Sequence, residues 1–125
     1  MPQPRVWSPT ASPLSSPACS GLGPVPAVKQ ALRRARWDIR SIERIEINEA
    51  FAAIAIVVAR ELGLPDDIVN VEGGAVAHGH PIGATGAVLT TKLIHSMKHD
   101  GLKRGVVTLC IGGGQGIALA IENLH

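Results

Sequence analysis

The pattern of apolar and polar residues predicts helices and strands only after residue 21. Residues 24–35 place apolar side chains at helical spacing and basic ones on the opposite side, with prolines at the start. Residues 42–47 alternate apolar with charged residues, which is typical of a strand. From Ala50 to Ala59 the chain is apolar on every side, which predicts a helix that is buried all round and capped by Asn48.

The second half of the chain predicts one more helix and two strands. Pro81 suits the first position of a helix that runs to about Lys98. Residues 105–111 and 117–121 are nearly continuous apolar runs, as expected of strands covered on both faces. The connection between these two strands is so short that they must lie side by side and run antiparallel. We therefore expect an α/β fold, part of a larger layered structure, with a three-strand mixed sheet and about three helices.

The first 20 residues differ in composition from the rest of the chain. They are rich in proline and serine and contain almost no aliphatic residue, so they cannot bury a core. We expect residues 1–20 to be a disordered tail and residues 21–125 to form the single, incomplete domain.

Composition and charge narrow the function. The chain has 125 residues, is 46% hydrophobic but only 2% aromatic, and carries a formal net charge of +2, which favours no nucleic-acid partner. No apolar run is long enough to cross a bilayer. Two cysteines, Cys19 and Cys110, suggest no disulfide framework. We expect a soluble, cytoplasmic protein that binds neither nucleic acid nor membrane.

The glycine-rich stretch from Val69 to Gly86 is the first candidate site. If Pro81 starts a helix, His80 is its N-cap, where the helix dipole favours a neutral imidazole. A neutral imidazole can accept a proton from a thiol or polarise a carbonyl group. A histidine that only caps the helix is an equally good interpretation of the spacing.

Two further positions fall at the ends of predicted elements. Cys110 ends a strand and is followed by three glycines, whose backbone N–H groups could bind an oxyanion beside the thiol. A plain buried cysteine is the commoner case. Asn48 lies at a strand-to-helix junction, where most asparagines are simply caps. Sites in α/β folds collect at such ends, which strengthens all three candidates.

A metal site is the weaker alternative. His78 and His80 form an H-x-H pair, and Cys110 offers a soft ligand. The sequence offers no second ligand cluster, so we expect no bound metal.

Three blocks of sequence together resemble the C-terminal motifs of the thiolases. They are Asn48-Glu49-Ala50-Phe51, the run from Asn70 to Gly86 with Gly79-His80-Pro81, and Cys110-Ile111-Gly112-Gly113-Gly114-Gln115-Gly116. The resemblance starts near Gly21 and continues to the C-terminus. It implies a thiolase-like fold and an acyl-CoA acyltransferase that makes or cleaves the carbon–carbon bond of 3-ketoacyl-CoA thioesters. It implies no resident cofactor, because the coenzyme A thioester is the substrate, and a homo-oligomer for the intact enzyme.

The resemblance also assigns roles by position. His80 corresponds to the histidine that deprotonates the nucleophilic cysteine and helps to bind the thioester oxygen. Cys110 corresponds to the cysteine that moves a proton to or from the α-carbon, and Asn48 to the residue that holds a water in the first oxyanion hole. The Gly112 backbone N–H corresponds to a donor of the second oxyanion hole, and Phe51 to a residue lining the pantetheine channel.

The sequence departs from the family pattern in one important respect. The nucleophilic cysteine of the family lies in an N-terminal half that these 125 residues do not contain. Cys19 does not replace it, because prolines flank it and the activating helix is absent. Ile54 stands where the family usually has glutamine. We therefore expect a C-terminal thiolase fragment that is inactive alone. The alternative is a non-catalytic thiolase-like module that binds acyl-CoA or a protein.

Overall fold

The computed structural model describes residues 4–11 and 22–124, without the side chains of residues 7–11. The β-strands are β1 (Arg5–Ala11), β2 (Arg44–Ile47), β3 (Arg104–Ile111) and β4 (Gln115–Glu122). The α-helices are α1 (Pro24–Ala35), α2 (Ala52–Leu62), α3 (Ala75–His78) and α4 (Thr85–His99). Short 3₁₀ turns are η2 (Ile39–Ser41), η3 (Asp66–Ile68) and η4 (Gly112–Gly114).

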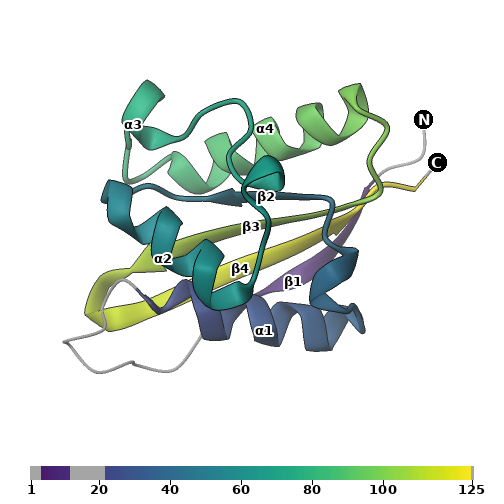
Figure 1. Cartoon of the computed structure of the whole chain (residues 1–125), viewed down its shortest axis with the longest axis horizontal. Coiled ribbons are helices and arrows are strands. Elements are labelled where there is room, and N and C mark those ends of the chain that lie inside the picture. The colour runs from purple at the N-terminus through teal and green to yellow at the C-terminus, as the bar shows by residue number, and fades with distance from the viewer. Residues whose placement is uncertain (1–3, 12–21, 125) are drawn as a thin grey trace.

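The four strands form one mixed sheet in the order β1-β4-β3-β2. Strands β2 and β3 are parallel, whereas β4 is antiparallel to both β3 and β1. Helices α1 and α2 cover one face of the sheet, and α3 and α4 lie on the other side (Figure 1). The α/β class and the antiparallel last two strands are as predicted from the sequence.

Strand β1 corrects the expected three-strand sheet and the expected disorder of residues 1–20. Arg5–Ala11 pairs with β4, opposite Glu122 to Ile117. The pairing depends on backbone hydrogen bonds, which need no apolar side chains. Pro9 falls where the register shifts, between Trp7 and Thr10, and an edge strand tolerates its missing N–H there. The rest of the expected tail, including Cys19, lies outside the described residues.

Two hydrophobic clusters pack against the two faces of the sheet. The larger one joins α1 and α2 to β2, β3 and β4, through residues such as Val28, Val58 and Val106. The smaller one joins α4 to the opposite face, with Leu89, Leu93, Met97, Val107 and Ile121 at its centre. Neighbouring residues of β3 therefore face different layers, as the alternation of side chains along a strand requires.

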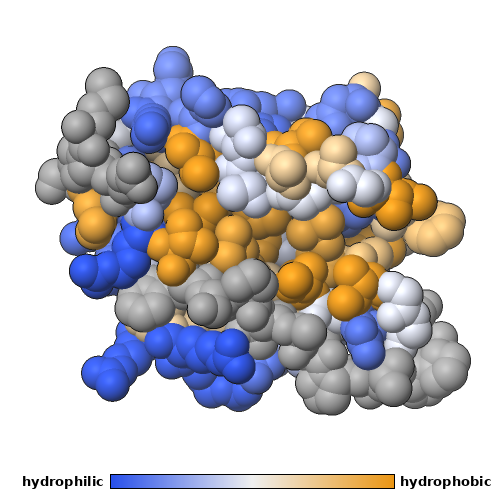
Figure 2. Space-filling view, turned by 180° about the vertical axis from the view of Figure 1, so that it is seen from behind, coloured by the Kyte–Doolittle hydropathy of each residue, from blue (hydrophilic) through white to orange (hydrophobic). Residues whose placement is uncertain are grey.

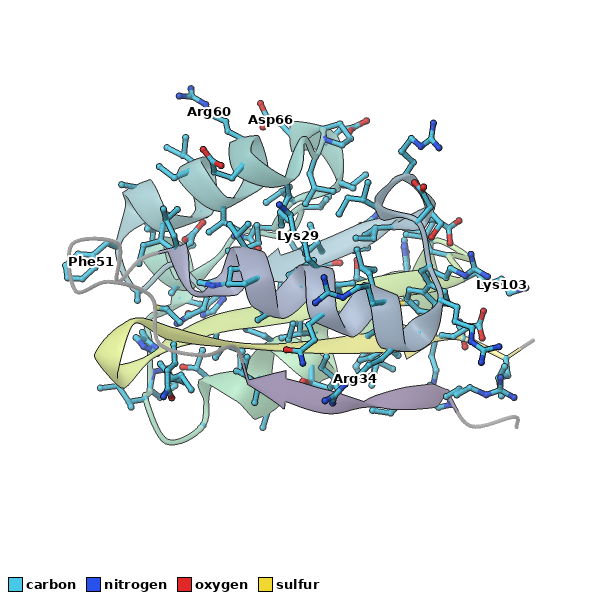
Figure 3. The ribbon with its side chains drawn as sticks, turned by 90° about the horizontal axis from the view of Figure 1, so that it is seen from below. Lys29, Arg34, Phe51, Arg60, Asp66 and Lys103 are labelled. Atoms are coloured by element: carbon cyan, nitrogen blue, oxygen red, sulfur yellow. The ribbon has the colours of Figure 1, made fainter. Side chains whose placement is uncertain are left out.

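Helix α1 crosses the start of β4 at very short range. The backbone of Gly23 touches that of Gln115 and Gly116, so a methyl group on either glycine would overlap main-chain atoms of the other segment. The basic residues of α1 point away from the sheet, and Lys29 and Arg34 project into solvent (Figure 3). The predicted helix 24–35 and its exposed basic face agree with the structure.

The other helices differ from the sequence prediction. Helix α2 starts at Ala52 with Phe51 as its N-cap residue, because the backbone N–H of Asn48 still donates to Thr108 O and extends the pairing with β3. Its outer side is exposed at Ile56 and Val57, so this helix is not buried all round. Helix α4 starts at Thr85 rather than at Pro81. Helix α3 was not predicted.

Within the described residues, no helix combines the length and apolarity needed to cross a membrane.

Candidate active site

The candidate residues collect where the parallel strands β2 and β3 reach their carboxyl ends. Figure 1 shows the starts of α2 and α4, helix α3 and the β3–β4 turn at the same end of the molecule. Asn48 follows β2 directly, and Cys110 is the second-last residue of β3. Ligands of α/β folds bind at such ends because the loops there leave the sheet in different directions.

Asn48 is a buried polar residue with an unused acceptor. It is 1% exposed, and its backbone N–H donates to Thr108 O at 2.9 Å. Its Nδ2 lies 3.4 Å from Nε2 of His80. Its Oδ1 is buried and has no hydrogen-bond partner among the described residues. A buried amide oxygen without a partner is costly, so the position fits a site that is completed by a water or a ligand.

Asn70 and Glu49 fix the backbone around Asn48. Asn70 adopts a left-handed conformation, with φ 46°, and its side chain accepts from Ile47 N at 2.8 Å and donates to Ile47 O at 2.9 Å. The Glu49 carboxylate accepts from Asn70 Nδ2 at 3.2 Å and from Val76 N at 2.8 Å. Glu49 thus ties the end of β2 to α3, and it precedes the first turn of α2. A methyl group at position 74 would overlap the Glu49 carboxylate, so it would displace that carboxylate from these hydrogen bonds.

His80 lies in a turn that precedes α4, not at the helix N-cap. The N–H groups of Ala84 and Thr85 both donate to Pro81 O at 2.8 Å, and Ala84 is the N-cap residue. His80 therefore does not occupy the N-cap position at which a helix dipole would favour a neutral ring. The ring is instead held by contacts at both nitrogens: Nδ1 is 2.7 Å from Oγ1 of Thr85, and Nε2 faces Asn48.

Cys110 is a free, half-buried thiol next to the glycine turn. Burial raises the pKa of this thiol above its ordinary value. Gly113 and Gly114 both have a φ of 75°, which favours glycine. Gly112 has no positive φ, and a methyl group there would meet open space. The fold itself therefore does not require glycine at position 112, and its backbone is open to an approaching ligand.

Exposed apolar side chains surround this end of the molecule. Phe51 is 76% exposed and projects outward from the start of α2 (Figure 3). Val76 on α3 and Ile82 in the turn before α4 are 71% and 85% exposed. Apolar groups that cluster at the mouth of a polar site are typical of a surface that binds a ligand or another part of a protein.

The site residues predicted from the sequence are His80, Cys110, Asn48, Gly112 and Phe51. Of these, Asn48 and His80 are in contact in the structure. Cys110 and Gly112 lie on the neighbouring strand and the turn after it, at the same end of the sheet. Sequence reasoning missed Thr85. Its only signal is its place five residues after His80, at the start of α4. No group of three His, Cys, Asp or Glu side chains within the described ranges is placed to hold a metal ion.

Comparisons with known proteins identify the family. The profile described as "Thiolase, C-terminal domain" matches residues 7–123. The acetyl-CoA acetyltransferase of Chromobacterium violaceum is 53% identical over 106 residues, and the cytosolic acetyl-CoA acetyltransferase of Rattus norvegicus is 48% identical. The crystal structure of the Bacillus anthracis acetyl-CoA acetyltransferase superposes with a TM-score of 0.93 at 44% identity, covering 99% of this chain. The chain therefore belongs to the thiolase family, and it matches the C-terminal domain.

The match covers only part of each relative. The aligned residues are 85% of this chain but 27% of the Chromobacterium and rat proteins. For the Bacillus structure, the covered share is 31% of that chain. The profile match starts at residue 7, so the predicted boundary at residue 21 lies inside the matched stretch.

Proposed function

We propose that this chain supplies the C-terminal catalytic residues of a thiolase-type acyl-CoA acyltransferase. The reaction is thiolysis of a 3-ketoacyl-CoA or, in reverse, Claisen condensation of acyl-CoA. The observation that supports it best is the pair formed by Asn48 and His80 at the carboxyl end of β2, beside the end of β3 that carries Cys110. The relatives are named as acetyl-CoA acetyltransferases, so we propose a coenzyme A thioester as the substrate.

In this proposal His80 activates a cysteine that these 125 residues do not supply. Nε2 of His80 accepts the proton of that thiol, and in the condensation direction the thiolate attacks the thioester carbonyl of acyl-CoA. The carbon–sulfur bond to coenzyme A breaks, coenzyme A leaves with the proton from His80, and the acyl group is transferred to the cysteine sulfur in a covalent intermediate. In thiolysis the thiolate attacks the 3-keto carbonyl instead, the bond from that carbon to the α-carbon breaks, and the α-carbon takes up a proton. The Asn48 side chain holds a water and the Gly112 N–H donates directly, each to an oxyanion that develops during the reaction.

Cys110 moves the proton at the α-carbon in the same proposal. Its pKa is raised by burial, so its thiolate, once formed, is a stronger base than an exposed one. That property suits the removal of a proton from carbon. Phe51, exposed at the start of α2, lines the path of the pantetheine arm.

The first test is activity of the chain alone. We expect negligible cleavage of acetoacetyl-CoA, because covalent catalysis lacks its nucleophile. Cleavage at an ordinary enzymatic rate, on the order of 1 per second or more, would contradict this expectation.

The second test is a graft into a complete relative. The segment of the Chromobacterium violaceum protein that aligns with this chain is replaced by the chain's own residues. We expect thiolysis within about tenfold of the parent rate. In the graft, His80→Ala is expected to lower kcat by about 10²–10⁴-fold and Asn48→Ala by about 10²–10³-fold. Asn123→Ala removes a buried asparagine that bonds Leu102 O, at the opposite end of the sheet, and serves as the matched control.

The activity of the graft distinguishes the two functions predicted from the sequence, a thiolase-type acyltransferase and a non-catalytic thiolase-like module. A folded graft that binds acyl-CoA but has no activity favours the non-catalytic module.

We also propose a cytoplasmic location, which the name of the cytosolic rat relative supports, and a homo-oligomer for the assembled enzyme.

A further inference from the structure

The hydroxyl of Thr85 has a defined role in the hydrogen-bond network around His80. Thr85 is 1% exposed, and its Oγ1 donates to Pro81 O at 2.9 Å. The same oxygen lies 2.7 Å from Nδ1 of His80. A hydroxyl has one proton to donate and lone pairs to accept. Since its proton is directed to Pro81 O, the oxygen accepts from the ring, and Nδ1 carries the hydrogen.

The contact at the other ring nitrogen fits the same tautomer. Nε2 faces Nδ2 of Asn48, which is a donor group, at 3.4 Å. A hydrogen on Nε2 would place donor against donor, whereas a lone pair on Nε2 accepts from the amide. With the Asn48 amide in this orientation, both ends of the ring are satisfied when Nδ1 is protonated and Nε2 is not.

We propose that Thr85 is a positioning residue that holds His80 in the Nδ1–H tautomer, with the Nε2 lone pair directed toward Asn48 and the reacting groups. The tautomer follows from the contacts alone, but its use as a proton acceptor rests on the proposed function. A histidine acts as a base through the nitrogen that lacks a proton, so the wrong tautomer would turn an acceptor into a donor.

The test is the tautomer of His80, measured on the whole chain without substrate. Long-range ¹H–¹⁵N correlation spectra of ¹⁵N-labelled protein, recorded at a pH where imidazole is neutral, distinguish the two forms. His80→Gln identifies the signal. We expect mostly Nδ1–H in the wild type and in Thr85→Ser, which keeps the hydroxyl. In Thr85→Val we expect a change to mostly Nε2–H, the form that an unconstrained histidine favours.

Thr90 gives a matched control on the same helix. Its Oγ1 donates to Gly86 O at 2.7 Å, four residues earlier, as Thr85 does to Pro81. Thr90→Val is therefore expected to leave the His80 signal unchanged. Mostly Nε2–H in the wild type, or an unchanged tautomer in a folded Thr85→Val, would overturn the proposal. If Thr85→Val does not fold, the spectra of the wild type and of Thr85→Ser still test the proposal, because mostly Nε2–H in either protein would contradict it.

The result is independent of the graft experiment. An inactive graft together with an Nδ1–H ring contradicts the proposed function and supports the role of Thr85. An active graft with an Nε2–H ring contradicts the role of Thr85 only.

Discussion

Glu46 is a buried carboxylate on β2, and its surroundings affect how stability depends on pH. The residue is 0% exposed, and its Oε2 accepts from Lys92 Nζ on α4 at 2.7 Å. Lys92 also donates to Gly73 O, in the segment that leads to the site. Oε1 of Glu46 has no hydrogen-bond partner in the described part of the chain. Burial raises the pKa of Glu46, and the hydrogen bond and charge of Lys92 lower it in part.

The raised pKa of Glu46 determines whether its contribution to the free energy of unfolding rises or falls with pH. The folded state holds the Glu46 proton more tightly than the unfolded chain does, so stability falls as the pH rises from the ordinary glutamate range through the raised pKa. Each unit of displacement corresponds to about 1.4 kcal/mol. In Glu46→Gln this contribution is absent. We therefore expect the free energy of unfolding of the variant, relative to the wild type, to increase with pH in urea titrations.

Asp38 is a control with the opposite sign. It lies on the surface beside Arg40, whose side-chain hydrogen bond lowers its pKa. Its stabilisation is present above the ordinary aspartate range and is lost as the pH falls. Asp38→Asn should therefore show no relative gain as the pH rises. A flat difference between Glu46→Gln and wild type from acid to neutral pH would contradict the assignment to Glu46.

At the residue scale, the sequence pointed to most of the candidate site but not to its supports. Asn48, His80 and Cys110 stand out because each falls at the end of an element predicted from the sequence and matches a family motif. Thr85 and Asn70 act through hydrogen bonds that the fold creates: Thr85 contacts the His80 ring, and Asn70 bonds both the N–H and the C=O of Ile47. Glu46 belongs to a strand that was predicted from its alternation of apolar and charged residues, a pattern that does not show what lies against the charged residues. In the structure, Lys92 of α4 pairs with the buried Glu46 carboxylate.

Among the elements, the crossing of α1 over β4 sets how closely the helix layer approaches the sheet. Gly23 and Gly116 meet backbone to backbone, so neither position has room for a side chain. Overpacking of a close contact typically costs about 1–3 kcal/mol. We expect Gly116→Ala to lower the free energy of unfolding by that amount, measured by urea denaturation followed by circular dichroism.

Gly112→Ala is the matched control from the same glycine-rich turn. A methyl group there meets open space, and the backbone is not in the left-handed region. The expected change in stability is within about 0.5 kcal/mol. Equal destabilisation by the two substitutions would show that the turn, and not the crossing with α1, limits position 116.

The sequence predicted that helices α2 and α4 exist, but it did not predict their first residues correctly. Asn48 and Pro81 are both good helix starters, yet the helices begin at Ala52 and Thr85. Tertiary contacts override the local preference in each case. Asn48 remains paired with β3, and Pro81 O accepts two N–H groups of a turn before α4 begins. Local residue preferences do not contain these distant or competing contacts.

In the whole molecule, the two helix layers are unequal. The cluster around α1 and α2 is much larger than the one around α4. Beside α4, the described residues of the sheet form an apolar groove, and Figure 2 shows an apolar area below that helix. Its lining includes Gly86 and Thr90 of α4 and Leu109, Ile117 and Leu119 of the strands.

This asymmetry predicts uneven local stability. Segments with few buried apolar contacts open at lower free energy than the core. We expect amides in the first turns of α4, residues 88–91, to exchange with solvent at least about tenfold faster than amides of α1 around Leu32, measured by native-state hydrogen exchange. Equal protection of the two helices would mean that the open groove does not weaken α4.

The sequence by itself determined the α/β class, helix α1, the last two strands and the motif residues His80, Cys110 and Asn48. Those features depend on local periodicity, short connections and residue type, all of which can be read along the chain. It also indicated membership of the thiolase family through the order and spacing of its three motifs.

Only the tertiary structure decided the rest. Strand β1 forms because β4 offers an edge, which composition does not reveal. The Val69 to Gly86 stretch does not place His80 at a helix start. It places the ring between Asn48 and Thr85, and the hydrogen bonds at both nitrogens come from residues 32 positions before it and 5 positions after it. Such geometry depends on distances in space between residues, which the order of residues does not specify.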